Sequence, residues 1–324
     1  MFAAISRLFD NNLRRNKGPW RQTPSFKPEH LDSLKSTIGN FSPPPALNIS
    51  RARILLIGMT GSGKSSIYNT FDSFFSGRIT QKAICGSTAG SLTTAYRPYL
   101  IRGSADKPLN FWLCDTCGLE ESGGPNLVEL NYLLDGHVPV GYQFNPESPI
   151  TPQVSGFIKH PKPEDRVHCV VFVIDATSVD LAPNWFWKRL KKLQVQMNKK
   201  GIPRVVFLTK IDKVSTAIAD DVSMVFQSRE FKQKVTKVAE KLGVPENSIL
   251  PIRNYYEETN LDDKINILAL TALDQVLSFT NDFFIGQIDL MEGSGRHDIN
   301  ETQLFFVIAV CIVFIVLVAY FFLR

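Results

Sequence analysis

Residues 58–66, GMTGSGKSS, have the residue types and the spacing of a phosphate-binding loop. Glycines let the backbone turn tightly and aim N–H groups at phosphate oxygens, and the start of a helix adds partial positive charge there. Lys64 would reach the β- and γ-phosphates, and the Ser65 hydroxyl would hold Mg²⁺, a hard cation that needs oxygen ligands. The candidate nucleotide ligands of this loop are Gly58, Gly61, Ser62, Gly63, Lys64, Ser65 and Ser66.

The motif DTCG at residues 115–118 follows an apolar run one strand beyond the phosphate loop. In nucleotide-switch proteins a DxxG at this place supplies an Asp to the Mg²⁺ shell, usually through water, and a Gly whose N–H meets the γ-phosphate. Asp115 and Gly118 are therefore candidate nucleotide ligands, and the predicted Mg²⁺ ligands are Ser65, Thr93 and Asp115. A simple turn after a strand is the alternative for a DxxG taken by itself.

The motif TKID at residues 209–212 predicts which base is bound. The Asp212 carboxylate can accept hydrogen bonds from both the N1–H and the 2-amino group of guanine, whereas adenine offers no such pair. The stem of Lys210 would lie along the base, and Thr209 joins this candidate set. Three motifs in this order predict GTP or GDP with Mg²⁺ as ligands, and an ATP-using P-loop protein is the alternative. The loop at residues 253–260 lacks the usual Ser/Thr-Ala-Lys/Leu triplet, so base contacts from Asn254 or Tyr255 stay open.

Three of the predicted strands end at these motifs, and amphipathic stretches of helix length lie between the strands. The predicted strands cover residues 54–57, 94–101, 109–114, 169–174, 205–208 and 249–252, and the predicted helices cover residues 64–75, 183–199, 228–242 and 264–279. A continuous apolar run such as CVVFVI is typical of a strand that is covered on both faces. The pattern predicts an α/β, three-layer P-loop GTPase domain with a mainly parallel sheet and one antiparallel hairpin.

Composition limits the other classes of function. With 324 residues and 44% hydrophobic content, the chain is long enough to bury a packed core. The net charge of +5 is concentrated near the N-terminus, and the nearly neutral remainder argues against nucleic-acid binding. Five cysteines without a secretory signal suggest reduced thiols. Neither the CxxC of Cys114 and Cys117 nor the histidines have a second ligand pair at metal spacing, so no zinc site is predicted.

The C-terminal region is the second main feature. The twenty residues from Leu304 to Leu323 carry no charge, and as a helix they would extend about 30 Å, the thickness of a hydrocarbon core. We expect a single-pass tail anchor in the lipid bilayer with a cytosolic GTPase domain, in the endoplasmic reticulum rather than the mitochondrial outer membrane. The predicted division is a basic helix with a Pro-rich linker at 1–50, the GTPase domain at 51–285, a linker at 286–303 and the anchor at 304–323.

The catalytic residues are the least defined part of the site. In Ras-like switches the residue after DxxG is a Gln that orients the attacking water, and here that residue is Leu119. Slow intrinsic hydrolysis is therefore expected. Arg78 and Arg97 flank the loop that carries Thr93, and either would serve a neighbouring site in a GTP-dependent homodimer or oligomer. The alternative is that both are solvated loop charges.

Several stretches resemble the interferon-induced protein 44 and 44-like family of vertebrate GTP-binding proteins. They are RILLIGMTGSGKSS, CGSTAGSLTTAYR, LCDTCGLE, LDGHVPVGYQFNPESPIT, FLTKID and NYYEETNLDDKINILALTALDQVL. The resemblance covers roughly residues 19–284, and GHVPVGYQFNP is its most specific part. It implies a GTP-binding, immune-induced protein and carries over Gly58, Gly63, Lys64, Ser65, Asp115, Gly118, Lys210 and Asp212 as nucleotide-binding residues. Family members often carry an upstream TLDc domain, which we expect this chain to lack, and they are usually described as soluble.

Motifs, resemblance and tail together predict a membrane-anchored GTP/GDP switch or assembly GTPase of the innate immune response. A slow or non-hydrolysing GTP-binding scaffold at a membrane is the alternative.

Overall fold

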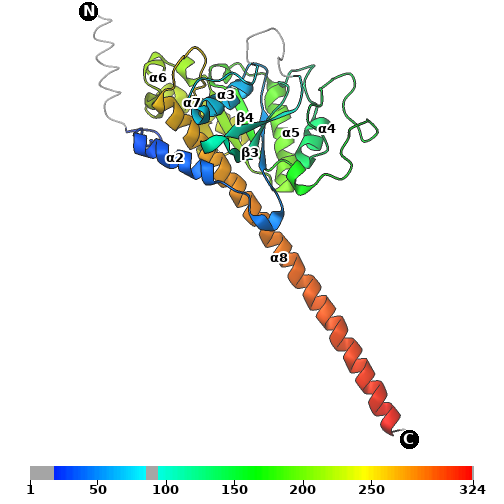
Figure 1. The fold of residues 1–324 in the computed structure, drawn as a ribbon. Helices are drawn as coiled ribbons and strands as arrows, with labels where there is room; N and C mark the ends of the chain where they lie inside the picture. The colour runs from blue at the N-terminus through cyan, green and yellow to red at the C-terminus, as the bar shows by residue number, and fades with distance from the viewer. Residues whose placement is uncertain (1–17, 85–93, 323–324) are drawn as a thin grey trace, which may run out of the picture.

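The computed structural model describes residues 18–84 and 94–322, with side chains described up to residue 293 except that of Ser104. Six strands form one sheet in the order β2-β3-β1-β4-β5-β6. They are β1 (Ala52–Ile57), β2 (Arg97–Arg102), β3 (Pro108–Asp115), β4 (Cys169–Asp175), β5 (Arg204–Thr209) and β6 (Ile249–Pro251). Figure 1 labels two of them, β3 and β4, with helices packed around the sheet. Neighbouring strands are parallel except for the antiparallel pair β2 and β3, which confirms the predicted α/β fold and its hairpin.

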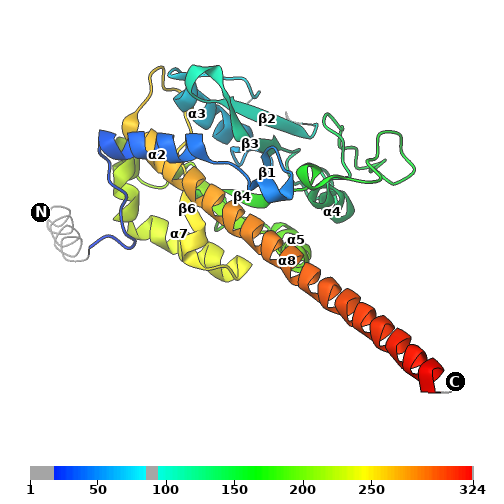
Figure 2. The same ribbon diagram turned by 60° about the horizontal axis from the view of Figure 1, so that its bottom comes forward.

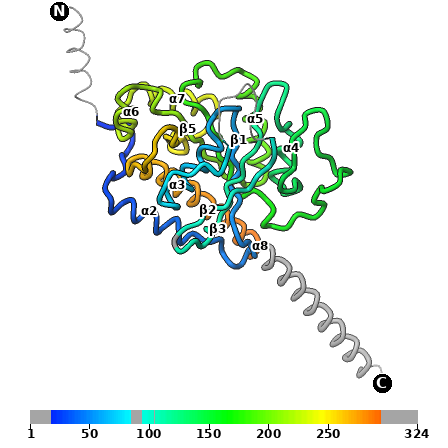
Figure 3. The backbone as a smooth tube through the Cα atoms, turned by 45° about the horizontal axis from the view of Figure 1, so that its top comes forward, coloured from blue at the N-terminus to red at the C-terminus, as the bar shows by residue number. Residues whose placement is uncertain are grey.

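Helices cover both faces of this sheet, which explains why β1, β4 and β5 are largely apolar, with Arg53, Asp175 and Arg204 as their charged residues. The helices are α2 (Pro28–Asn40), α3 (Lys64–Ser76), α4 (Leu127–Asp135), α5 (Asn184–Lys200), α6 (Thr216–Asp220), α7 (Arg229–Leu242) and α8 (Asp263–Phe322). Helices α4, α5 and α7 pack on the face that holds Leu55 and Phe172. Helices α2, α3 and α8 pack on the face that holds Leu56 and Val171, so the two groups lie on opposite sides of the sheet (Figure 3).

The segment before the phosphate loop packs on the domain. The indole N–H of Trp20 donates to the carbonyl oxygen of Val225 at 2.9 Å, and the Trp20 ring lies 6.0 Å from that of Phe226. Helix α2 lies beside α8 and buries Leu34 and Ile38 (Figure 2). The basic helix predicted near the N-terminus lies outside the described residues.

Helix α8 is continuous from Asp263 to Phe322 and packs on the sheet as far as the fully buried Phe284. Across the part of the chain that the structure describes, no helix is both long enough and apolar enough to cross a membrane. Residues 263–293 of α8 are too polar because they include Asp263, Lys264, Asp274, Asp282, Asp289 and Glu292. This finding contradicts the predicted localisation, a single-pass tail anchor in the endoplasmic reticulum. The side chains from Leu304 to Leu323 themselves lie outside those described.

Candidate nucleotide-binding site

The phosphate loop joins β1 to α3 and depends on glycine at three positions. Gly61 and Gly63 have φ angles of 74° and 95°, in the left-handed region that residues with side chains rarely adopt. Gly58 is constrained by space instead, because a Cβ there would lie 2.1 Å from the carbonyl oxygen of Val173 in β4. The loop is therefore built against the central strands and has a fixed shape.

Lys64, the first residue of α3, lies inside this loop and is only 6% exposed. Its ammonium group donates to the carbonyl oxygens of Gly58 and Met59, both at 3.1 Å. Burial lowers the pKa of Lys64, while the carboxylates of Asp115 and Glu120 act in the opposite direction. A buried cation at the start of a helix provides the positive charge that a phosphate group needs.

Ser65 and Asp115 lie in direct contact at the carboxyl end of β3. The Ser65 hydroxyl donates to Oδ2 of the fully buried Asp115 at 2.6 Å, and Oδ1 of Asp115 accepts the N–H of Thr116 at 3.0 Å. A hydroxyl and a carboxylate are donors that fit Mg²⁺, whose remaining ligands would be phosphate oxygens and water. The third predicted ligand, Thr93, lies outside the described residues. The described residues contain no group of three His, Cys, Asp or Glu that could hold a metal ion.

The DTCG segment lies directly on the phosphate loop. A Cβ on Gly118 would lie 2.6 Å from the backbone nitrogen of Thr60, so only glycine permits this approach. The N–H of Leu119 donates to the carbonyl oxygen of Gly58 at 2.9 Å. The Leu119 side chain is 1% exposed and belongs to the core, so it presents no surface to a water molecule in the site.

The TKID segment ends β5 on the other side of the phosphate loop. The Thr209 hydroxyl donates to the carbonyl oxygen of Ser62 at 2.7 Å, which joins the strand to the loop. Lys210 has a φ of 54°, and its ammonium forms an ion pair with Asp175 at 2.7 Å. Asp212 is half-buried, and its carboxylate has no hydrogen-bond or ion-pair partner among the described residues. The segment therefore presents one carboxylate that is available to a ligand.

The loop at residues 253–260 reaches both the phosphate loop and the TKID segment. The Asn254 amide donates to the carbonyl oxygen of Gly63 at 3.4 Å, so Asn254 supports the loop. Tyr255 is 8% exposed, and its hydroxyl donates to Oδ1 of Asn266 at 2.8 Å. The aromatic side chain that sequence reasoning missed is Tyr256, which is 81% exposed with the ammonium of Lys213 5.5 Å from its ring centre. The signal that identifies Tyr256 is an exposed aromatic side chain in the loop that the sequence predicts to pass near the base.

The two candidate arginines lie in different places. Arg97 begins β2, is exposed, and has Asp115 as its partner in the antiparallel pair, so it lies beside the predicted Mg²⁺ ligand. Arg78 follows the C-terminus of α3, where its guanidinium donates to the carbonyl oxygen of Ile79 at 3.3 Å. At 1.5 Å per residue, α3 separates Arg78 from Lys64 by about 20 Å. Within one chain the fold therefore brings Arg97 to the site but not Arg78.

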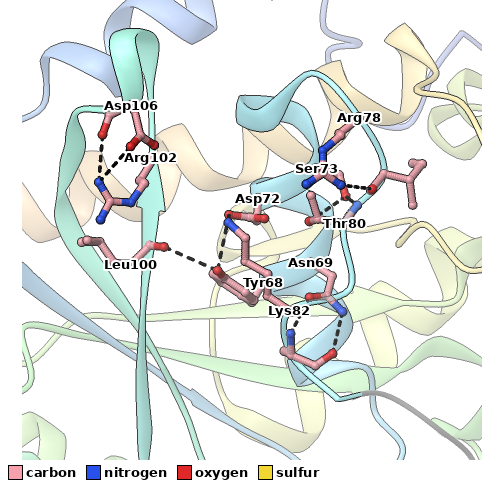
Figure 4. A network of polar contacts seen from close by, with 12 residues as sticks. Tyr68, Asn69, Asp72, Ser73, Arg78, Thr80, Lys82, Leu100, Arg102 and Asp106 are labelled. Atoms are coloured by element: carbon pink, nitrogen blue, oxygen red, sulfur yellow. Dashed lines mark hydrogen bonds and ion pairs between the residues drawn. The ribbon is translucent and has the colours of Figure 1, made fainter.

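Sequence reasoning also missed the polar face of α3, which holds the residues just before position 84. The Asn69 amide donates to the carbonyl oxygen of Ala83 and accepts its N–H, both at 2.9 Å (Figure 4). Ser73 accepts the N–H of Thr80 at 2.8 Å (Figure 4). The segment that leads toward residues 85–93 is thus fixed to the helix that begins at Lys64.

The fold is a three-layer α/β domain in which a glycine-rich loop joins the central strand β1 to helix α3. Solved structures with a similar fold include a dimerization-deficient mutant of Toc33 from Arabidopsis thaliana, at TM-score 0.45 and 14% identity, covering 81% of this chain and 94% of that one. Another is a probable GTP-binding protein engB, at TM-score 0.40 and 15% identity, covering 70% of this chain and 99% of that one. No family model matches the chain.

Curated relatives give the family. Interferon-induced protein 44-like of Homo sapiens is 38% identical over 258 residues, which are 79% of this chain and 57% of that protein. Interferon-induced protein 44 of Mus musculus is 30% identical over 295 residues, which are 87% of this chain and 70% of that protein. The chain belongs to the interferon-induced protein 44 family, as its motifs predicted. It spans 57% of the length of the human relative.

Proposed function

We propose that this chain is an interferon-induced GTP-binding protein that holds guanine nucleotide and Mg²⁺ at the carboxyl edge of its sheet. The observation that carries the proposal is the gathering of three features around one loop: the buried Lys64, the Ser65 and Asp115 pair, and the half-buried Asp212. Membership of the interferon-induced protein 44 family supports induction by interferon.

Each residue has a role that follows from its position. Lys64 supplies positive charge to the β- and γ-phosphates, and the start of α3 adds partial positive charge. Ser65 would hold Mg²⁺ directly and Asp115 through water, so the 2.6 Å bond between them would lengthen to admit the ion. Asp212 accepts the N1–H and 2-amino hydrogens of guanine, and the exposed ring of Tyr256 would lie against the base.

Turnover of GTP in this site is expected to be slow. A Gln that orients the attacking water is missing, and Leu119 occupies its place with its side chain in the core. A GTP-binding protein with little hydrolysis is therefore the second candidate, and the burial of Leu119 is the observation that favours it. Arg97 is the arginine whose position beside Asp115 would allow it to act on a phosphate.

The test measures base specificity. Fluorescent GDP is titrated into the full chain with Mg²⁺, and unlabelled GTP, ATP and xanthosine triphosphate compete for the site. The wild-type protein should prefer GTP to ATP by about tenfold or more, because an unpaired buried polar group costs about 1–3 kcal/mol and about 1.4 kcal/mol is a factor of ten. Asp212→Asn should weaken guanine binding about tenfold and gain xanthosine binding, because an amide N–H can donate to the carbonyl that replaces the 2-amino group.

The matched control is Asp220→Asn, which removes an exposed carboxylate from nearby α6 and should leave all three affinities unchanged. Equal competition by GTP and ATP against the wild-type protein would overturn guanine specificity and favour an ATP-using protein. Binding of no nucleotide at all would overturn the proposed function.

A further inference from the structure

The hydrogen bond between Thr60 of the phosphate loop and Glu120 has no role in the proposed function. The Thr60 hydroxyl donates to Oε1 of Glu120 at 2.7 Å. The backbone beside it is also paired, since Met59 and Leu119 form a parallel bridge. Glu120 is therefore held at the rim of the phosphate loop by both side-chain and backbone contacts.

A second element holds Glu120 in place without cancelling its charge. Arg189 of α5 donates to the backbone carbonyl oxygen of Glu120 at 2.8 Å, and the guanidinium of Arg189 lies 5.2 Å from the ring centre of Trp185. Arg189 thus contacts the main chain and not the carboxylate. Within the described residues, no ion pair involves Glu120. Its half-buried carboxylate therefore accepts a hydrogen bond from Thr60 but forms no direct ion pair.

This charge acts on the place where a terminal phosphate would bind. The Lys64 ammonium is bonded to the carbonyl oxygens of Gly58 and Met59, the two residues before Thr60. Glu120 is close enough to Lys64 to raise the pKa of its ammonium. A γ-phosphate bound to Lys64 would add negative charge in the same neighbourhood, and like charges in a partly buried site repel strongly. A diphosphate lacks that group.

We propose that Glu120 determines how the site distinguishes GTP from GDP. With GDP, the Glu120 carboxylate stays on Thr60 and closes the rim of the loop. With GTP, the γ-phosphate displaces it, so that binding of the triphosphate opens the contact between the phosphate loop and residues 118–121. This inference rests on the proposed function and adds the residue that would make the site respond to the third phosphate.

The test compares Glu120→Gln, which removes the charge and keeps the acceptor for Thr60, with Glu121→Gln as the matched control. Glu121 is the next residue and is exposed. The affinities of GDP and of a non-hydrolysable GTP analogue are measured with Mg²⁺ on the full chain, at low and high salt. Thermal unfolding of each variant verifies that it is folded.

The Glu120→Gln variant should bind the GTP analogue about tenfold more tightly relative to GDP than the wild-type protein does, with GDP affinity within about twofold. The Glu121→Gln variant should behave as wild type. The gain should be smaller at high salt, which screens the repulsion. Thr60→Val removes the hydrogen bond and leaves the charge, so it should shift the ratio in the same direction by less.

The proposal would be overturned if a folded Glu120→Gln protein binds both nucleotides with the wild-type ratio of affinities for the GTP analogue and GDP. That result would leave the proposed function intact. Slower GTP hydrolysis with an unchanged ratio would also overturn the proposal for Glu120, because Glu120 would then act on the attacking water. Failure of the wild-type protein to bind either nucleotide would overturn both proposals.

Discussion

Burial of His168 predicts that the domain loses stability in mildly acidic solution. His168 is 2% exposed and lies between β1 and α8, with its ring 5.0 Å from that of Phe284. Its Nδ1 accepts the N–H of Arg53 at 2.8 Å, so Nε2 carries the proton and donates to the carbonyl oxygen of Pro163 at 3.1 Å. The ring is therefore neutral in the folded protein.

The pKa of His168 is lowered from 6.5 to about 4, mainly because the ring is buried. The hydrogen bond to Pro163 raises this pKa, and the charges of Arg53 and Arg166 contribute to lowering it. In the unfolded chain the ring takes up a proton near its ordinary pKa. Between these two values the unfolded state binds more protons, so stability rises with pH and is fully present above about 6.5. Lowering the pH from 7 to 5 should cost about 2 kcal/mol.

The assay is urea unfolding of the full chain followed by tryptophan fluorescence at pH 5, 6 and 7. The His168→Asn variant keeps a nearby acceptor but cannot titrate, so its free energy of unfolding should change much less over this range. His160→Asn, at an exposed position, is the matched control and should keep the wild-type slope. Lysine partners lower the pKa values of Asp180 and Asp221 to about 2, so those carboxylates lose their contribution only below pH 4. Equal slopes for wild type and His168→Asn would refute the reasoning.

Three shorter predictions concern the site. Tyr256→Ala should weaken the binding of GDP and of GTP about fivefold each, because both nucleotides would lose the same ring contact with the base. Tyr256→Phe should restore wild-type affinity, measured by competition against fluorescent GDP. Leu119→Gln should lower the free energy of unfolding by roughly 2 kcal/mol in urea, since it buries an amide, and phosphate release should stay near zero. Gly58→Ala should abolish GDP binding in titrations while circular dichroism still shows a folded domain, because its Cβ would meet the carbonyl oxygen of Val173 at 2.1 Å.

The sheet was predictable because its central strands are covered on both faces. Continuous apolar runs such as residues 169–174 have no polar side to place in water, and the strands predicted at 54–57, 109–114 and 205–208 end at motifs whose backbone requirements are local. The glycines of the phosphate loop are such local requirements, as the positive φ of Gly63 shows. The predicted membrane localisation was wrong, since no helix among the described residues is both long enough and apolar enough to cross a membrane, and residues 263–293 of α8 are too polar.

Contacts between distant segments were not predictable, because neither partner has an unusual sequence by itself. Trp20 packs near Phe226 across about two hundred positions of sequence, and Asn69 pairs with the backbone of Ala83. The bond from Thr60 to Glu120 belongs to the same group. The motifs predicted that Ser65 and Asp115 share one Mg²⁺ site, and the two side chains lie in contact because α3 begins beyond the carboxyl end of β1 and Asp115 ends the adjacent parallel strand β3.

The stretch GHVPVGYQFNP, which no general GTPase motif explains, gains a structural role from its backbone. The N–H of Tyr96 donates to the carbonyl oxygen of Tyr142 at 2.9 Å, and the N–H of Phe144 donates to the carbonyl oxygen of Thr94 at 2.9 Å. The Tyr142 hydroxyl donates to the buried Glu129 at 2.7 Å, at the start of α4.

Residues 94–96 are therefore held by the same stretch that holds the start of α4, while the residues before 84 are held by α3. Helix α3 begins at Lys64 of the phosphate loop, and α4 follows Gly118 in the chain. Glu129 and Tyr142 thus connect the start of α4 to the backbone at residues 94–96, which gives the stretch GHVPVGYQFNP its place in the fold.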